Sequence, residues 1–407
     1  MTRLWDKGEP LDERVLRYTA GEDHLLDARL VPYDVRASIA HAEMLHRAGL
    51  LPAGDLAAIQ EGLTALAESH AAGEWRIELA DEDVHTALEN RLGEAGANLH
   101  LGRSRNDQVL AALRLYLRDE VEALRDGALK VAAALDALGG REASTPLPGY
   151  THQQPAMPSS VALWAGGFAS ELRDDADGLA AAQRRLGKNP LGSAAGYGVP
   201  LLPIDREDTR RSLGFAEVHE PVTAVQLSRG KAEAHVLFEV ALLLQDLGRL
   251  AADLVLFSMK ELGFVTLHPE MTTGSSIMPQ KRNPDVFELI RGRTATGIAC
   301  LVEVLGITAK LPSGYHRDLQ LLKAPLFRGI DLARDTLAIL APALDGVRFH
   351  RVELAPELNA AEEAYRLVLE EGIPFREAYR RVGERYKPHP LSPSPISRPL
   401  FPGRGGT

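Results

Sequence analysis

The stretch from Ser104 to Leu138 contains no proline and repeats its apolar residues every three or four positions. That spacing places the apolar side chains on one face of an α-helix. Such a helix is about 50 Å long, which exceeds the usual helix of a globular domain. We therefore predict a helix from Ser104 to Leu138, ended by Gly139 and Gly140. Its apolar stripe consists of Leu110, Leu113, Leu117, Val121, Leu124, Ala128, Val131, Leu135 and Leu138.

A second long stretch, residues 222–262, repeats its apolar residues at the same steps. Leu237, Leu244 and Val255 lie outside that stripe, so this helix should be buried on several sides. The other long helical stretches are residues 155–185, 284–310 and 318–340, the last interrupted near Pro325. Strand patterns are sparse. The predicted fold class is all-α, an elongated long-helix bundle whose surplus apolar faces pack against other subunits.

Shorter predicted helices divide the rest of the chain. They span residues 34–48, 55–72, 82–92, 355–372 and 375–385. The predicted units are an N-terminal helical domain at 1–103, a central bundle at 104–344, a C-terminal helical domain at 345–386 and a Pro-rich disordered tail at 387–407. His85 and Glu89 share one helical face. We interpret His85 as a histidine at the surface or its boundary.

Composition excludes several classes of function. The chain of 407 residues is 45% hydrophobic, enough for a large core, and its net charge of −10 argues against a general attraction to nucleic acid or anionic membranes. No apolar run is long enough to span a membrane. The single cysteine, Cys300, excludes an intrachain disulfide and favours a reducing compartment, the cytoplasm. Because it lies in an apolar helical stretch, we predict that Cys300 is buried and inert.

Two junctions between the long helices carry clustered polar groups. In residues 100–108, Ser104 is the predicted N-cap of the long helix. Arg103 and Arg105 oppose the dipole at that helix end, so we consider them as ligands for carboxylates. In residues 148–155, His152 taken alone is more often a structural histidine than a catalyst. The Gly-rich segment 189–198 lacks the Gly-Lys-Ser/Thr of a phosphate loop.

A third junction, Gly274 to Asp285, combines two serines, Lys281 and Arg282 with glycine and prolines. We expect an irregular loop that leads into a helix, with Asn283 as N-cap and Pro284 at the first helical position. Residues 315–323 add a further polar segment. The sequence contains no metal-ligand spacing, no nucleotide-binding fingerprint and no Gly-x-Ser-x-Gly elbow.

These junctions resemble a known family. Residues 274–285 are similar to the signature of the fumarase/aspartase superfamily, whose general form is Ser-Ser-x-Met-Pro-x-Lys-x-Asn. Three further motifs identify a smaller group within this superfamily and resemble the argininosuccinate lyase family. They are residues 103–108, 148–152 and 318–320. The resemblance runs from about Leu4 to Tyr386. It implies a homotetramer with active sites built from three subunits, and cleavage of argininosuccinate to arginine and fumarate without a cofactor.

The resemblance also implies residue roles. Ser275 is the general base, supported by Lys281, and His152 is the acid or its relay, paired with Glu288. The implied substrate-binding residues are Arg105, Asn106, Thr151, Asn283, Tyr315, Gln320 and Lys323.

The chain departs from the family pattern at Leu101, Gly21, Pro155 and Met157, and a Pro-rich tail stands where members continue with a further helical segment. We expect the four residues to alter binding detail more than reaction type. The alternatives are another fumarate-releasing lyase, such as adenylosuccinate lyase or fumarase, and a catalytically silent, crystallin-like structural protein.

Overall fold

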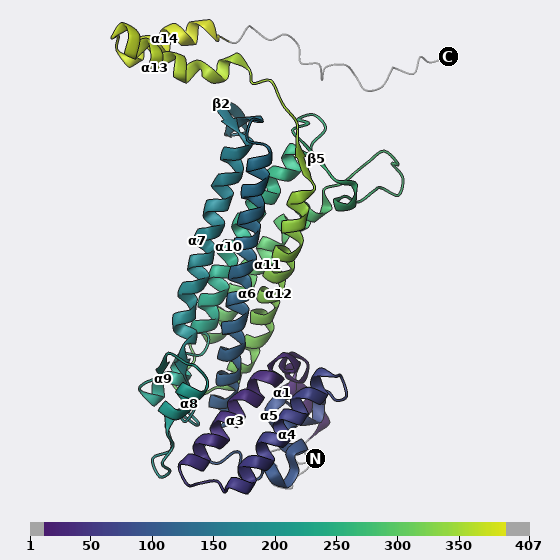
Figure 1. Ribbon diagram of the computed structural model, residues 1–407, viewed down its shortest axis with the longest axis vertical. Helices are drawn as coiled ribbons and strands as arrows, with labels where there is room; N and C mark the ends of the chain where they lie inside the picture. The colour runs from purple at the N-terminus through teal and green to yellow at the C-terminus, as the bar shows by residue number, and fades with distance from the viewer. Residues whose placement is uncertain (1–11, 388–407) are drawn as a thin grey trace.

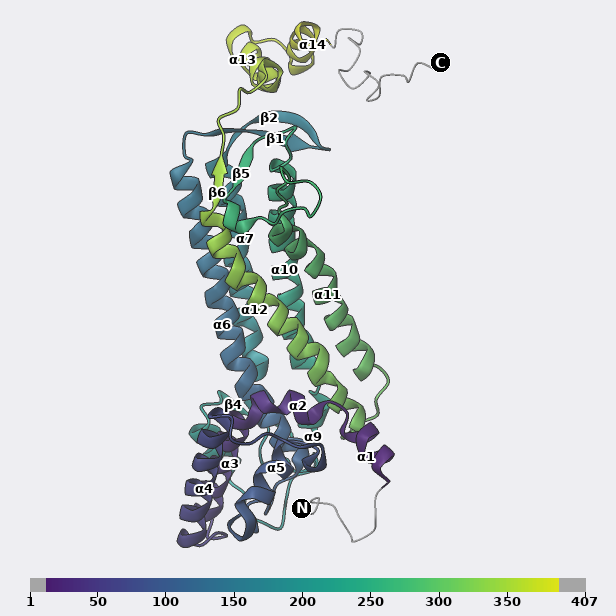
Figure 2. The same cartoon turned by 90° about the vertical axis from the view of Figure 1, so that its right-hand side faces the viewer.

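Five long helices form the centre of the protein (Figure 1). The computed structural model describes residues 12–387, so the predicted tail lies almost entirely outside the described residues. The helices run side by side in both views and make an elongated bundle (Figure 2). They are α6 (Arg105–Arg141), α7 (Val161–Leu186), α10 (Lys231–Phe257), α11 (Asp285–Thr308) and α12 (Lys323–Asp345). The predicted all-α long-helix bundle is confirmed.

The shorter helices gather at the ends of the bundle. The N-terminal helices lie beside the start of α6, and α13 and α14 lie beyond its other end (Figure 1). These helices are α1 (Glu13–Ala20), α2 (Asp23–Leu26), α3 (Val31–Arg47), α4 (Ala53–Ala71), α5 (Val84–Leu92), α8 (Arg206–Ser212), α9 (Val222–Leu227), α13 (Ala360–Glu371) and α14 (Phe375–Arg385). The proposed domain boundaries at 103, 344 and 386 remain a prediction.

Six short strands form three two-stranded pairs within residues 12–387. Two pairs are antiparallel and one is parallel. The strands are β1 (Pro146–Thr151), β2 (Gln154–Ser160), β3 (Lys188–Asn189), β4 (Glu217–Val218), β5 (Val265–Leu267) and β6 (Val347–Phe349).

The β1–β2 hairpin corrects one prediction. Residues 155–160, expected to be helical, form β2, and α7 begins only after Ser160, whose Oγ accepts from the backbone N–H of Leu163 at 3.1 Å. Pro155 and Pro158 lack the N–H that a continuous helix needs, whereas an isolated two-stranded hairpin leaves outward-facing positions that tolerate proline.

Two of the predicted long helices also have other boundaries in the structure. Gly139 and Gly140 lie inside α6 and do not end it. Gly139 has no side chain, so α7 can pack closely against this part of α6: a Cβ at Gly139 would lie 3.4 Å from Ala162 Cα. The stretch 222–262 is two helices, separated at Gly230, whose φ of 80° is in the left-handed region.

The expected cap at Asn283 was wrong. The cap position of α11 is Pro284, and the Asn283 side chain instead donates to Gly274 O at 3.3 Å. The interruption predicted near Pro325 is present: a 3-10 helix at Arg317–Leu322 changes to the α-helix α12 at Lys323. Pro325 lies in the first turn of α12, where a proline costs no intrahelical hydrogen bond.

The apolar stripes form the core of the bundle. Every residue of the α6 stripe is buried, from Leu110 to Leu138, which confirms the periodicity prediction. On α10, Leu237 and Leu244 are buried beside the main stripe, as predicted for a helix covered on several sides. Cys300 is fully buried, also as predicted. No helix within residues 12–387 is long and apolar enough to cross a membrane.

Gly329 tests how closely this core is packed. A Cβ at Gly329 would lie 2.5 Å from Leu237 Cδ2 and 3.6 Å from Cys300 Cβ, at the contact of α10, α11 and α12. Gly329→Ala should lower the free energy of unfolding by about 1–3 kcal/mol, because a full core must shift to admit a methyl group.

Gly140→Ala is the matched control. A Cβ at Gly140 meets nothing within 4 Å, so alanine should raise stability by about 0.5–1 kcal/mol. Chemical denaturation at one protein concentration measures both variants. Equal effects of the same sign would contradict the packing argument.

Candidate active site

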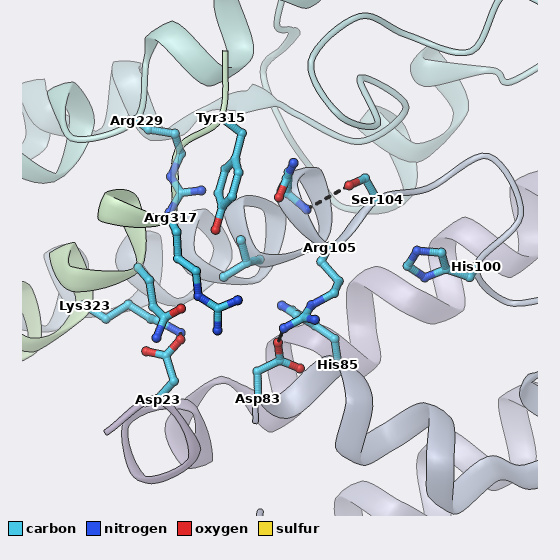
Figure 3. Close-up of a pocket in the computed structure, with 13 residues that line it drawn as sticks. Asp23, Asp83, His85, His100, Ser104, Arg105, Arg229, Tyr315, Arg317 and Lys323 are labelled. Atoms are coloured by element: carbon cyan, nitrogen blue, oxygen red, sulfur yellow. Dashed lines mark hydrogen bonds and ion pairs between the residues drawn. The ribbon is translucent and has the colours of Figure 1, made fainter. Parts of the chain in front are cut away.

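A polar cavity of about 330 Å³ lies at the N-terminal end of α6 (Figure 3). Segments far apart in the sequence supply its walls, and five of the seven predicted substrate-binding residues are among them. Its lining residues are Asp23, Asp83, His85, His100, Ser104, Arg105, Asn106, Val109, Arg229, Tyr315, Arg317, Gln320 and Lys323. The structure therefore brings Arg105, Asn106, Tyr315, Gln320 and Lys323 together.

The capped start of α6 forms part of the cavity wall. Ser104 is the N-cap, as predicted: its Oγ accepts from the Asn106 backbone N–H at 3.3 Å, and its own N–H donates to Asp107 Oδ1 at 3.0 Å. The other Asp107 oxygen accepts the backbone N–H groups of Gly192 and Ala194, at 3.0 and 2.8 Å. The Gly-rich segment is thus bound to the start of α6, and burial raises the pKa of Asp107 to about 6.

Arg105 is held by carboxylates of the N-terminal helices. Its guanidinium forms a short ion pair with Asp83 and lies 3.4 Å from Glu82 Oε2. Asp83 is also the N-cap of α5 and accepts from the Thr86 backbone N–H at 2.9 Å. Burial favours a higher pKa for Asp83, but the His85 and Arg105 cations outweigh it and lower that pKa. Arg105 is therefore pre-positioned as a cation facing the cavity.

Lys323 lies in a buried cluster with two carboxylates. Its ammonium donates to Asp27 Oδ1 at 2.6 Å and lies 2.9 Å from Asp23 Oδ2. Burial alone would lower the pKa of Lys323, but Asp27 and Asp23 reverse that effect and raise it. Burial raises the pKa of Asp23 to about 7, despite the neighbouring lysine. Both Asp23 and Lys323 present polar groups to the cavity.

His85 was placed at the surface by sequence reasoning, and the structure shows that this was wrong. The side chain is buried, and its Nδ1 forms a short ion pair with Asp34 on α3. Burial would lower the pKa of His85, but Asp34 outweighs it and raises that pKa. No local pattern reveals this, because the partner is 51 residues away.

Of the other cavity cations, Arg229 had no sequence signal, whereas Arg317 lies in the polar segment 315–323. Arg229 donates to Leu319 O at 3.3 Å and Arg317 to Thr19 O at 2.8 Å, so each cation is fixed by a backbone carbonyl. Arg103, considered above as a carboxylate ligand, is buried outside the cavity lining and donates to Ser38 Oγ at 2.8 Å. Its structural role explains why a cation is tolerated beside that helix start.

Thr151 and His152 lie at the opposite end of the bundle, on the β1–β2 hairpin (Figure 2). Both side chains are exposed. His152 and Gln153 form the two-residue turn with φ values of 53° and 58°. Such left-handed backbone costs about 1–3 kcal/mol per residue outside glycine and is often found at functional sites. The hairpin therefore presents His152 at a strained, accessible tip.

The signature loop extends from that same end of the bundle. Its base is closed by backbone hydrogen bonds between Thr273 and Asn283, at 2.9 and 3.2 Å. Ser275 Oγ accepts from the Met278 backbone N–H at 3.1 Å, which folds the serine into a local turn. Lys281 is exposed and has no ion pair within the described residues. Glu288 is exposed in the first turn of α11.

The predicted site residues thus form two groups. Arg105, Asn106, Tyr315, Gln320 and Lys323 lie at the start of α6, whereas Thr151, His152, Ser275, Lys281, Asn283 and Glu288 lie at the far end of the bundle. The 37 residues of α6 span about 55 Å. Within residues 12–387, no group of three or more His, Cys, Asp or Glu side chains has the arrangement of a metal site.

Comparison with known proteins shows which family this chain is similar to. A lyase family model matches residues 12–297. The chain is 48% identical over 388 residues to the argininosuccinate lyase of Sorangium cellulosum, covering 93% of this chain and 90% of that protein. It is 41% identical over 392 residues to that of Thermotoga neapolitana, covering 94% and 98%. The crystal structure of class II fumarase from Schistosoma mansoni matches the fold with a TM-score of 0.78 and 18% identity, over 91% of this chain and 88% of that one.

The buried Lys323 cluster makes a pH-dependent prediction. Lys323→Met should lower the free energy of unfolding by about 3–5 kcal/mol at pH 8, because it leaves buried carboxylates without a cation. The pKa of Asp23 is already raised in the folded protein, and an acid with a raised folded pKa destabilises the fold increasingly as pH rises above its unfolded pKa. The loss should therefore be smaller at pH 5.

Denaturation of both proteins at the two pH values measures this difference. Asp23→Asn in the Lys323→Met background should recover part of the stability at pH 8. A loss that is the same at pH 5 and pH 8, with no recovery, would show that Lys323 contributes packing alone.

Proposed function

The chain belongs to the lyase family, in its argininosuccinate lyase branch, and from this premise we propose that it cleaves argininosuccinate to arginine and fumarate. The observation that carries the proposal is the cavity at the start of α6, where two distant segments converge: 105–106 supplies Arg105 and Asn106, and 315–323 supplies Tyr315, Gln320 and Lys323. The cytoplasm remains the proposed location, supported by the single cysteine.

The cavity has the charges that this substrate needs. Argininosuccinate carries three carboxylates, a guanidinium and an ammonium group. Arg105, Arg229 and Arg317 are cations with fixed geometry, suited to carboxylates. Asp23 and Asp83 are the carboxylates among the lining residues, and Asp83 is already paired with Arg105. Asp23 is paired as well, with Lys323 at 2.9 Å, so the cationic end of the substrate would share a carboxylate that already has a partner.

The proposed reaction is an elimination. Ser275 removes a proton from the carbon next to a succinyl carboxylate, which leaves an aci-carboxylate with two negatively charged oxygens. The carbon–nitrogen bond then breaks, and the electron pair stays on the departing guanidino nitrogen. Lys281, which is not engaged in an ion pair within residues 12–387, would balance the charge on the aci-carboxylate and help to form the serine alkoxide.

His152 is the proposed acid that protonates the departing nitrogen, with Glu288 as its partner. A carboxylate next to an imidazole favours the protonated ring, which is the form that donates the proton. Thr151 and Asn283 lie beside these groups in the chain and would bind the succinyl end of the substrate.

The separation of the two groups of residues supports a shared site. About 55 Å of α6 lies between them, so one chain cannot place Ser275 against its own Arg105 cavity. Antiparallel packing of bundles would bring the hairpin of one chain and the loop of another to the cavity of a third. We propose a homotetramer of this kind.

The exposed apolar side chains of the bundle fit such packing. Phe238, Leu242 and Leu256 lie along one face of α10, and Ile298, Val302 and Leu305 along one face of α11. Apolar stripes of this length on long helices usually bury against another subunit.

Ser275→Ala tests the base. Fumarate release, followed by ultraviolet absorbance, should fall by about 10²–10⁴-fold because the proton acceptor is lost. Ser276→Ala is the matched control and should keep most of the activity. Turnover of Ser275→Ala near that of the parent enzyme would refute the assignment. Offering adenylosuccinate and malate to the parent enzyme in the same assay separates the proposal from its family alternatives.

Glu288→Gln tests the proposed acid. Because the carboxylate favours the protonated imidazole, its loss should move the alkaline limb of the pH–rate profile to lower pH. Glu303→Gln, on the same helix but paired with Arg328, should leave the profile in place. An unmoved profile for Glu288→Gln would separate Glu288 from His152.

A further inference from the structure

A second polar cavity, of about 290 Å³, lies where α7 ends and α10 begins. Four cationic side chains line it, together with His219 and Ser228, and no described carboxylate does so. The four cations are Arg114, Arg185, Lys188 and Lys231. None of these residues belongs to the proposed active site. A concave surface with this charge is suited to an anion.

Arg114 is the fixed centre of this cavity. Its side chain is only 1% exposed. One terminal nitrogen donates to Lys188 O and to His219 Nδ1, the latter at 3.1 Å, and the other donates to Ser228 Oγ at 2.8 Å. Its Nε is buried and has no hydrogen-bond partner. Burial lowers the pKa of Arg114 to about 10, so the guanidinium remains charged at neutral pH.

The nearby carboxylates neutralise this charge only in part. Glu217 pairs with Lys188 at 2.8 Å, but it is largely exposed to solvent. The buried Glu233 acts on Arg114, but it also lies 3.8 Å from the Nε of Arg229, so its single charge is shared between two guanidinium groups. Burial and the surrounding cations lower the pKa of His219 to about 4, so the imidazole is neutral and accepts from Arg114. The Nε of Arg185 is also buried without a partner.

The start of α10 adds to the positive potential. This helix of 27 residues has Gly230 at its cap position and no side-chain cap. Ala232, in its first turn, lines the cavity. The first backbone N–H groups of a helix carry partial positive charge and commonly bind phosphate or carboxylate.

We propose that this cavity binds a small oxyanion of the phosphate class, at a site separate from the substrate cavity. The proposal rests on the buried Arg114 with its unpartnered Nε, on the excess of cations and on the uncapped start of α10. It does not depend on the reaction proposed above.

The same contacts connect this cavity to the substrate cavity. Arg114 holds Ser228, and the next residue, Arg229, lines the substrate cavity. A third cavity, of about 550 Å³, shares Arg229 with the substrate cavity and shares Arg185 and Lys231 with the cationic one. Anion binding is therefore expected to change the KM for substrate more than kcat.

Calorimetric titration of inorganic phosphate into the intact oligomer tests the proposal. Saturating fumarate is present, so that phosphate does not compete for the substrate cavity. Arg185→Gln should weaken phosphate binding about tenfold or more, through loss of a charge-assisted contact. Arg184→Gln is the matched control, since Arg184 is the preceding residue, is exposed and does not line the cavity.

Lys231→Gln is the second variant if Arg185→Gln does not fold, because Lys231 is exposed and also lines the cavity. A parallel titration with a simple phosphate monoester shows whether free phosphate or an organic phosphate binds more tightly.

Three results would overturn the proposal. The first is no phosphate binding either with or without fumarate. The second is equal weakening by Arg184→Gln and Arg185→Gln, which would indicate a general surface effect. The third is dissociation of the oligomer in Arg185→Gln, measured by light scattering, which would assign the cavity to contacts between chains.

Discussion

The length of α6 is the constraint on which the rest of the structure depends. One continuous helix of 37 residues places the substrate cavity at its first turn and the hairpin of His152 just beyond its last. The other four long helices run along α6, and the signature loop lies at the same end of the bundle as the hairpin (Figure 1). A rigid rod of about 55 Å cannot bend its two ends together. The chemistry proposed for this chain therefore requires ends from more than one chain.

The cavity end of that rod is organised by buried charge. Asp107 fixes the start of α6 to the Gly-rich segment, Lys323 fixes α12 to the N-terminal helices, and the pair of Asp34 and His85 fixes α3 to α5. Buried ion pairs of this kind contribute little net stability, because desolvation offsets their attraction. Removing one partner alone lowers the stability of the fold strongly, because it leaves the other charge buried and unpaired. The pairs therefore hold the cavity in a single geometry.

Sequence reasoning succeeded where the signal was local or periodic. The α6 stripe and the Ser104 cap each depend on residues within a few turns, and both are confirmed. It failed where a distant partner decides the outcome. His85 was misplaced because Asp34 on another helix buries it, and Gly139 does not end α6 because α7 packs against it. The hairpin was missed because four of its residues, at 146, 148, 155 and 158, are prolines and it has no alternating apolar pattern. The separation of Arg105 from His152 already follows from the predicted helix between them, whereas the grouping of Tyr315, Gln320 and Lys323 with Arg105 follows only from the assembled fold.

Subunit mixing tests the shared site most directly. Two variants are used: Arg105→Gln is defective at the cavity end, and Ser275→Ala is defective at the loop end. Their oligomers are dissociated and reassembled together, and fumarate release is then measured. Each variant reassembled alone should stay inactive. Random mixing of equal amounts should restore about one in four sites, because some cavities then meet an intact loop from a neighbour. A mixture as inactive as its two parents would contradict a site shared between chains.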